Sequence, residues 1–270
     1  MKIGCCLPGN FQMPGREGET TVLTALEDGY RYVLDAGYDF IEFTVGGIAG
    51  MTEEEFTQAV QLHSIGKLTV EACNCFIPSS LPLIGEQADR AAILAYLEKV
   101  LSRMAALGVE TVVFGSGGAR KIPEGTPAEQ VREQLDWFLC MAEKIARDMG
   151  TTIIIEPLNR GETNIILSVQ EGGEIVRRLD LPNLKLLADV YHMYKENESV
   201  DTIVRNGALL RHVHVAEPVN RTVPEDCDYL RLFSAALREV GYDGRVSIEG
   251  NLPNFAEEIC QVRPLMRKLF

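Results

Sequence analysis

Residues 151–162 read TTIIIEPLNRGE, a short apolar run that ends at Glu156 and continues into a polar loop. Similar runs recur along the whole chain, and segments with helical periodicity separate them. The eight candidate strands cover residues 3–7, 40–44, 68–76, 111–115, 152–156, 185–189, 212–215 and 245–249. Short, largely apolar strands are typical of parallel sheets that are covered on both faces. Eight strand–helix units in series therefore predict an α/β fold, a closed (β/α)8 barrel.

The connecting segments support the barrel. The clearest helical patterns cover residues 20–36, 88–107 and 128–149, the last with Pro127 at its start. Glycines suited to helix C-termini precede several strands, at Gly37, Gly66, Gly108, Gly150 and Gly241. The rival fold, an open doubly wound sheet, usually has fewer strands, and no GxGxxG motif follows the first strand here. Loops rich in Gly and Pro, at residues 8–18, 45–51, 78–85 and 115–127, would lie on the C-terminal face of the barrel.

Size and composition narrow the function classes. The chain has 270 residues, which fits a single barrel domain over residues 1–270. The formal net charge of −13 argues against a nucleic-acid partner. Seven cysteines without a CxxC pair indicate reduced thiols, and no apolar run reaches the ~18 residues of a membrane span. The first apolar run is too short for a signal peptide, so we expect a cytoplasmic location.

Chemistry-bearing residues mark the C-terminal ends of the last four candidate strands: Glu156, Asp189, His214 and Glu249. Neighbouring strands lie about 4.8 Å apart, so these side chains should converge. Three carboxylates in one dry site would repel each other, and a divalent cation relieves that repulsion. This mostly hard ligand set suits Mn²⁺ or Mg²⁺, while the imidazole also admits Co²⁺, Fe²⁺ or Zn²⁺. We expect one divalent ion, with Mn²⁺ as the first choice. For any single acid, the simpler interpretation is a helix N-cap.

Further polar residues follow at short offsets on the loops. Glu162 comes six residues after Glu156, His192 three after Asp189, and Arg221 seven after His214. Such groups around a metal can bind substrate hydroxyls and stabilise a developing oxyanion. The alternatives are a surface ion pair for Glu162 and Arg221, and a helix-start residue bonded to backbone for His192. Of the two histidines in HVH, we assign His214 to the barrel mouth and His212 to the helix layer.

These segments resemble the sugar phosphate isomerase/epimerase superfamily, the xylose isomerase-like TIM barrels. Within it, the chain is most similar to ketose 3-epimerases of the tagatose and psicose type. The matching patterns are Glu156 and Glu162 in EPLNRGE, Asp189 and His192 in DVYH, the HVHVAEPVNR segment at 212–221, and Glu249 in SIEGN. The segment VFGSGGARKIPEG, residues 113–125, is similar to segments of uncharacterised bacterial members.

The resemblance implies a mechanism. Glu156 and Glu249 would be metal ligands and also the catalytic acid–base pair. One would remove a proton from carbon to leave a cis-enediolate, and the other would protonate the opposite face, with the metal as Lewis acid. Glu162, His192 and Arg221 would bind the substrate. The partner would be a small sugar or polyol, with no nucleic acid and no membrane, and either a homodimer or a homotetramer is compatible.

Other functions remain open from the sequence. Aldose–ketose isomerisation and inosose-type dehydration begin with the same proton abstraction. An abasic-site endonuclease shares the barrel but needs further His and acidic ligands, which the strand at residues 68–76 does not supply. A non-catalytic sugar-binding barrel would not need the pair Glu156 and Glu249. A phosphorylated substrate is also open, because Arg120 and Lys121 in the glycine-containing loop at 115–121 could bind phosphate.

Overall fold

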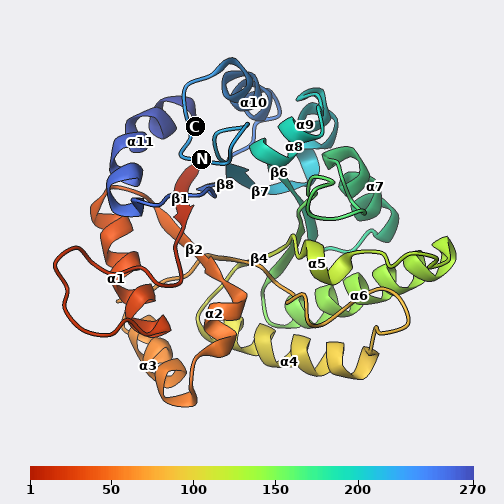
Figure 1. Ribbon diagram of the computed structural model, residues 1–270, viewed down its shortest axis with the longest axis horizontal. Helices are drawn as coiled ribbons and strands as arrows, with labels where there is room; N and C mark the ends of the chain where they lie inside the picture. The colour runs from red at the N-terminus through yellow and green to blue at the C-terminus, as the bar shows by residue number, and fades with distance from the viewer.

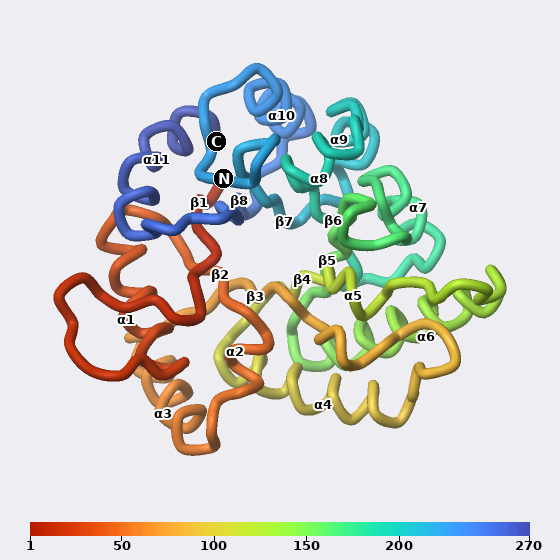
Figure 2. The backbone as a smooth tube through the Cα atoms, in the orientation of Figure 1, coloured from red at the N-terminus to blue at the C-terminus, as the bar shows by residue number.

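Eight parallel strands close into a barrel in chain order, β1 to β8, in a computed structural model that describes residues 1–270 (Figure 1). The strands are β1 (Lys2–Cys6), β2 (Phe40–Thr44), β3 (Ala72–Asn74), β4 (Thr111–Phe114), β5 (Thr152–Ile155), β6 (Leu184–Asp189), β7 (Leu210–Val215) and β8 (Arg245–Ile248). Figure 2 shows the chain start beside the last strand, where β1 pairs with β8 and closes the barrel. The predicted α/β barrel is confirmed.

Helices surround the strands as an outer ring (Figure 1). They are α1 (Val22–Asp35), α2 (Val45–Gly50), α3 (Glu53–Ser64), α4 (Arg90–Ala106), α5 (Gly117–Arg120), α6 (Ala128–Asp148), α7 (Val169–Leu179), α8 (Val190–Lys195), α9 (Asp201–Asn206), a 3-10 turn (Gly207–Leu209), α10 (Asp228–Glu239) and α11 (Phe255–Leu269). The three most clearly predicted helices correspond to α1, α4 and α6. No helix combines the length and apolar character that a membrane crossing requires.

Glycine ends several helices as predicted. Each of the five expected positions has a positive φ, between 64° and 87°: Gly37, Gly66, Gly108, Gly150 and Gly241. At Gly37, which follows α1, the chain reverses in the left-handed conformation that other residues adopt only with strain. The amide of Asp39 then bonds to the carbonyl of Ile3, which aligns β2 beside β1.

Some local predictions were wrong. The strand expected over residues 68–76 is shorter and covers only Ala72–Asn74. It ends there because Cys75 takes a left-handed backbone conformation, with φ of 53°, and leaves the sheet. The segments expected as loops at 45–51 and 115–127 contain the short helices α2 and α5. The hydroxyl of Thr44 accepts a hydrogen bond from the amide of Gly47 at 3.0 Å, and this cap starts α2 immediately after β2.

The strands divide the apolar side chains between two regions. Ile155 and Ala188 belong to the large core between strands and helices, whereas Val113, Ile154 and Leu187 form a separate small cluster. Residues two apart on a strand share a face, so Ile154 shares its face with Glu156 and Leu187 with Asp189. The small cluster therefore lies inside the barrel, beneath a layer of polar side chains at the C-terminal end.

Candidate metal centre

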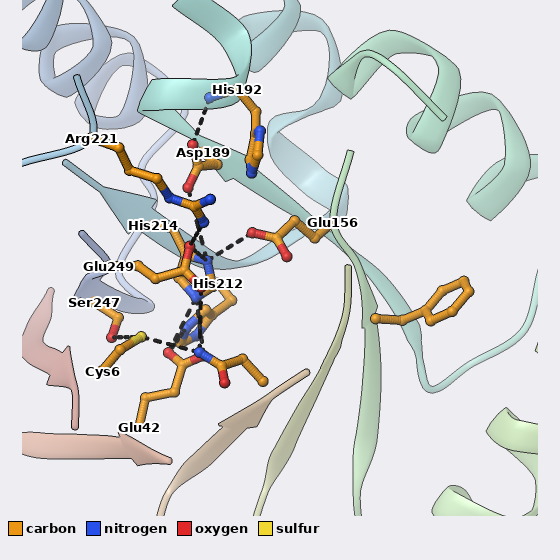
Figure 3. A network of polar contacts seen from close by, with 12 residues as sticks. Cys6, Glu42, Glu156, Asp189, His192, His212, His214, Arg221, Ser247 and Glu249 are labelled. Atoms are coloured by element: carbon orange, nitrogen blue, oxygen red, sulfur yellow. Dashed lines mark hydrogen bonds and ion pairs between the residues drawn. The ribbon is translucent and has the colours of Figure 1, made fainter. Parts of the chain in front are cut away.

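The four predicted ligand residues converge at the C-terminal end of the barrel (Figure 3). One ligand atom from each of Glu156, Asp189, His214 and Glu249 lies within 4.8 Å of the others. The Nδ1 atom of His214 lies 2.8 Å from Oε1 of Glu156, 3.4 Å from Oε2 of Glu249 and 3.9 Å from Oδ2 of Asp189. The side chains of Asp189 and His214 are fully buried, and those of Glu156 and Glu249 are 6% and 17% exposed.

The pairing of β6 with β7 aligns two of these residues. Leu186 pairs with Leu210 but Leu187 pairs with His212, so β7 carries one extra residue, Arg211. This bulge brings Asp189 opposite His214. Regular pairing would instead place Val213 opposite Asp189, and Val213 faces the helix layer. Bulges beside functional sites commonly redirect a side chain in this way.

The three carboxyl groups of the site differ in pKa in the absence of a cation. Burial, and then the charges of Glu156 and Glu249, raise the pKa of Asp189 to about 8. Burial also raises the pKa of Glu156. Burial opposes ionisation of Glu249 too, but His214 and Arg221 outweigh it and lower the pKa of Glu249. The crowded acids therefore do not all ionise readily in the metal-free site, and a divalent cation would favour their ionised forms.

The donor set fits a divalent cation. Asp189 Oδ2 is buried and has no hydrogen-bond partner. Its other oxygen, Oδ1, accepts a 2.7 Å hydrogen bond from the amide of His192 and caps helix α8. The N-cap interpretation and the metal-ligand interpretation therefore use different oxygens of one carboxylate. Three carboxylates and one imidazole match the ligands of Mn²⁺ or Mg²⁺, while the imidazole also suits softer ions.

His192 lies at the edge of this centre as a neutral hydrogen-bond donor. Its Nδ1 accepts a hydrogen bond from the backbone amide of Asn159 at 3.1 Å, so the ring proton must sit on Nε2. Nε2 is buried and has no partner in the protein. Burial, and then the charge of Arg221, lower the pKa of His192 to about 3. The imidazole stays uncharged at neutral pH and can donate to a ligand oxygen.

Arg221 joins the metal centre to the surrounding loops. Its guanidinium donates to Oε2 of Glu249 at 2.6 Å and to Oε1 of Glu162 at 3.2 Å. Asn159 donates to the same oxygen of Glu162 at 3.2 Å. The guanidinium also stacks over the ring of Tyr191, 5.2 Å from its centroid. Glu162, His192 and Arg221 therefore lie in one hydrogen-bonded group with the ligand residues, and Asn159, which no sequence pattern singled out, connects them.

The sequence patterns did not point to a fifth acidic residue in this region, Glu42. Glu42 on β2 is fully buried, and its Oε2 lies 2.7 Å from Nε2 of His212. Its Oε1 lies 3.0 Å from Nε2 of His214. The assignment of His212 to the helix layer was therefore wrong, because residues two apart on a strand share a face and both rings point into the barrel. The signal in the sequence was a lone acid in the apolar run FIEFT at Phe40–Thr44.

Arg120 does not serve as the phosphate clamp that the sequence left open. Its side chain is fully buried, and it donates to the carbonyl oxygens of Phe114 at 3.1 Å and Glu156 at 2.9 Å. Burial lowers the pKa of Arg120 to about 10, so it remains a cation at neutral pH. The guanidinium thus links the ends of β4 and β5 and supports the backbone that carries Glu156.

Comparisons with known proteins identify the family of this barrel. The family described as "Xylose isomerase-like TIM barrel" matches residues 30–267. D-psicose 3-epimerase from Agrobacterium fabrum is 29% identical over 168 residues, which are 61% of this chain and 58% of that protein. The 3-dehydro-D-guloside 4-epimerase from Escherichia coli is 26% identical over 232 residues, 83% of this chain and 86% of that protein.

A solved structure extends the fold comparison to the whole chain. It is D-allulose 3-epimerase from Methylomonas sp. in complex with D-allulose. The two chains align with a TM-score of 0.82 at 18% identity, covering 100% of this chain and 97% of that one. At this identity the likeness supports the barrel fold.

Proposed function

We propose that this chain, which belongs to the xylose isomerase-like TIM barrel family, is a divalent-metal-dependent epimerase of a ketose or a related keto sugar. The observation that carries the proposal is the convergence of Glu156, Asp189, His214 and Glu249 within 4.8 Å of one another. Relatives that act as ketose or keto-sugar epimerases support the reaction class.

The four residues would hold one cation, with Mn²⁺ as the ion we favour. Asp189 contributes the buried oxygen that lacks any other partner, and His214 contributes Nδ1, the nitrogen that faces the acids. A bound divalent cation would supply Lewis acidity, which stabilises the negative charge that develops on a substrate oxygen.

Glu156 and Glu249 would transfer the protons. They approach the centre from different strands, β5 and β8, so a substrate between them presents opposite faces of one carbon. One carboxylate removes the proton beside the carbonyl group, and the electron pair moves into a cis-enediolate. The other carboxyl group, in its acid form, returns a proton to the opposite face and inverts the carbon. The raised pKa of Glu156 and the lowered pKa of Glu249 give the two groups different proton affinities before substrate binds.

The surrounding residues would orient the sugar. The Nε2–H group of neutral His192 has no protein partner and would donate to a substrate oxygen. Arg221 is held between Glu249 and Glu162 and would place positive charge beside the enediolate. Glu162 is partly exposed and would accept a hydrogen bond from a substrate hydroxyl.

The carbon that is inverted distinguishes candidate substrates. One relative is named a 3-epimerase and another a 4-epimerase, so both positions belong in the test. Isomerisation and dehydration share the first proton abstraction and differ in the later steps. The buried position of Arg120 gives no support to a phosphorylated substrate at that loop.

A substrate screen in D₂O tests the proposal. Protein treated with chelator would be assayed with and without Mn²⁺ on ketohexoses, ketopentoses, 3-keto glycosides and an inosose, with products identified by NMR. We expect an epimer that carries one solvent deuterium at the inverted carbon and forms only with metal. Mn²⁺ binding without turnover of any sugar would favour the binding-barrel interpretation, and cleavage of an abasic oligonucleotide would favour the endonuclease.

A further inference from the structure

Glu42, His212 and His214 form a buried cluster beneath the proposed metal centre (Figure 3). All three side chains are 0% exposed. Glu42 lies on β2, whereas both histidines lie on β7, so the cluster links two strands that do not pair with each other. A buried carboxylate is unfavourable unless it is hydrogen-bonded. Here the only ring nitrogens that approach Glu42 are the two Nε2 atoms.

The cluster sets which nitrogen of His214 faces the acids. Nε2 of His214 lies 3.0 Å and 3.2 Å from the two oxygens of Glu42. Nδ1, on the other side of the ring, lies 2.8 Å from Glu156 and 3.4 Å from Glu249. A carboxylate can only accept hydrogen bonds, so the Nε2 atom that faces both oxygens of Glu42 carries a proton. The metal-free ring also holds a proton on Nδ1, which faces Glu156, and this is the proton that a cation would displace while Glu42 keeps the one on Nε2.

We propose that Glu42 is a positioning residue that holds the Nε2 proton of His214 and thereby presents Nδ1 to the divalent cation. The inference rests on the proposed metal-dependent function, and it adds a residue that the metal centre does not itself contain. Partners of this kind fix both the tautomer and the orientation of a histidine ligand. His212 donates to the same carboxylate at 2.7 Å and keeps Glu42 in place.

The substitution Glu42→Gln tests this role with little change in volume. A glutamine amide has one acceptor and one donor end, so its NH₂ group must face one of the two imidazole Nε2 atoms. Where that imidazole is His214, the ring proton moves to Nδ1, the nitrogen that the cation needs. Where it is His212, the Nε2–H of His214 faces a neutral amide oxygen in place of a carboxylate, which makes Nδ1 a weaker ligand. We expect the Kd for Mn²⁺, measured by calorimetry on chelator-treated protein, to rise about 10–100-fold.

Glu143→Gln is the matched control for loss of a buried carboxylate. Glu143 on α6 is 1% exposed, accepts a 3.0 Å hydrogen bond from the amide of Asn183, and lies outside the cluster. Both variants should fold, as judged by circular dichroism, and Glu143→Gln should bind Mn²⁺ with the affinity of the unmodified protein. Equal Mn²⁺ affinity in Glu42→Gln and the unmodified protein would overturn the inference. So would the binding of two Mn²⁺ ions per chain with loss of the second in Glu42→Gln, because Glu42 would then be a metal ligand itself.

Nitrogen-15 NMR of the histidine rings provides a readout independent of activity. The chain has four histidines, so single substitutions assign each ring. In Zn²⁺-loaded protein, we expect His214 to carry its proton on Nε2, and we expect this signal to change in Glu42→Gln but not in Glu143→Gln. If the unmodified protein binds no divalent cation, the proposed function fails. The spectra of the metal-free protein still test the role of Glu42. We expect Glu42→Gln to change the Nε2–H signal of His212 or of His214, and the inference is rejected if both signals stay unchanged.

Discussion

Asp189 stands opposite His214 in the pairing of β6 with β7, and one extra residue in β7, Arg211, produces this alignment. With regular pairing, Asp189 would face the position of Val213, whose side chain packs toward the helices. The bulge therefore brings a carboxylate and an imidazole from neighbouring strands to the same side of the barrel wall. Glu156 and Glu249 complete the group from β5 and β8, each just after its strand ends.

Substitution of either proposed proton-transfer residue should greatly reduce turnover. Glu156→Gln and Glu249→Gln each keep the side-chain shape but remove the carboxylate that accepts or returns a proton. We expect kcat to fall at least ~10²–10⁴-fold for each, since positioned acid–base groups typically contribute that much. The measurement is kcat at saturating Mn²⁺ on the substrate found in the sugar screen.

The control for these variants is Glu174→Gln, on the exposed surface of α7. It should retain full activity. If Glu156→Gln or Glu249→Gln turned over substrate at an undiminished rate with metal bound, that residue would have no role in proton transfer.

Metal binding should be linked to pH through Asp189. Burial and two neighbouring acids raise its pKa to about 8 in the metal-free protein, far above the ordinary value of an aspartate. Because this carboxyl pKa is raised on folding, Asp189 contributes fully to the free energy of unfolding of the metal-free protein at low pH. That contribution is lost as the pH rises toward about 8. A divalent cation favours the ionised form, so the increase in Tm on adding Mn²⁺ should be larger at pH 8 than at pH 6.

Thermal unfolding with and without Mn²⁺ at the two pH values checks this expectation. In Asp189→Asn, which cannot ionise at that position, the pH dependence of the Mn²⁺ effect should shrink. An equal increase in Tm at both pH values in the unmodified protein would show that no proton is released from Asp189 on binding.

Arg120 should contribute to stability and not to anion binding. Arg120→Met removes the donors to the carbonyl groups of Phe114 and Glu156, both buried at the ends of β4 and β5. The carbonyl of Phe114 keeps its hydrogen bond from the amide of Glu156, so the carbonyl of Glu156 is the acceptor that loses its partner. A buried acceptor without a partner costs about 1–3 kcal/mol, and the free energy of unfolding in urea should fall accordingly. Arg132→Met, at an exposed position, should change it by no more than about 0.5 kcal/mol. Tighter or weaker binding of inorganic phosphate in Arg120→Met would contradict this account.

Arg221→Met should separate catalysis from metal binding. Arg221 contacts Glu249 and Glu162 but is not among the four ligands. We expect kcat to fall about 10²–10³-fold, as when one group that stabilises a developing oxyanion is removed. The Kd for Mn²⁺ should change far less than in Glu42→Gln. Loss of metal binding together with activity would instead assign Arg221 to the structure of the centre.

The sequence predicted those parts of the site that depend on one strand at a time. An acid after an apolar run, as at Glu156, must emerge at the end of a buried strand, and successive parallel strands are neighbours in a barrel. The bulge at Arg211 could not be predicted, because it depends on how two strands pair. The cluster of Glu42 with His212 was missed for a related reason: β2 and β7 are far apart in the chain, and their side chains meet only inside the closed barrel.

The most direct test of the metal centre is a crystal structure of the protein soaked with Mn²⁺, with anomalous diffraction data collected at the manganese edge. We expect one anomalous peak among Glu156, Asp189, His214 and Glu249, about 2.0–2.3 Å from Nδ1 of His214 and from a carboxylate oxygen of each acid. The absence of a peak at saturating Mn²⁺, or a peak bound by other residues, would contradict the account.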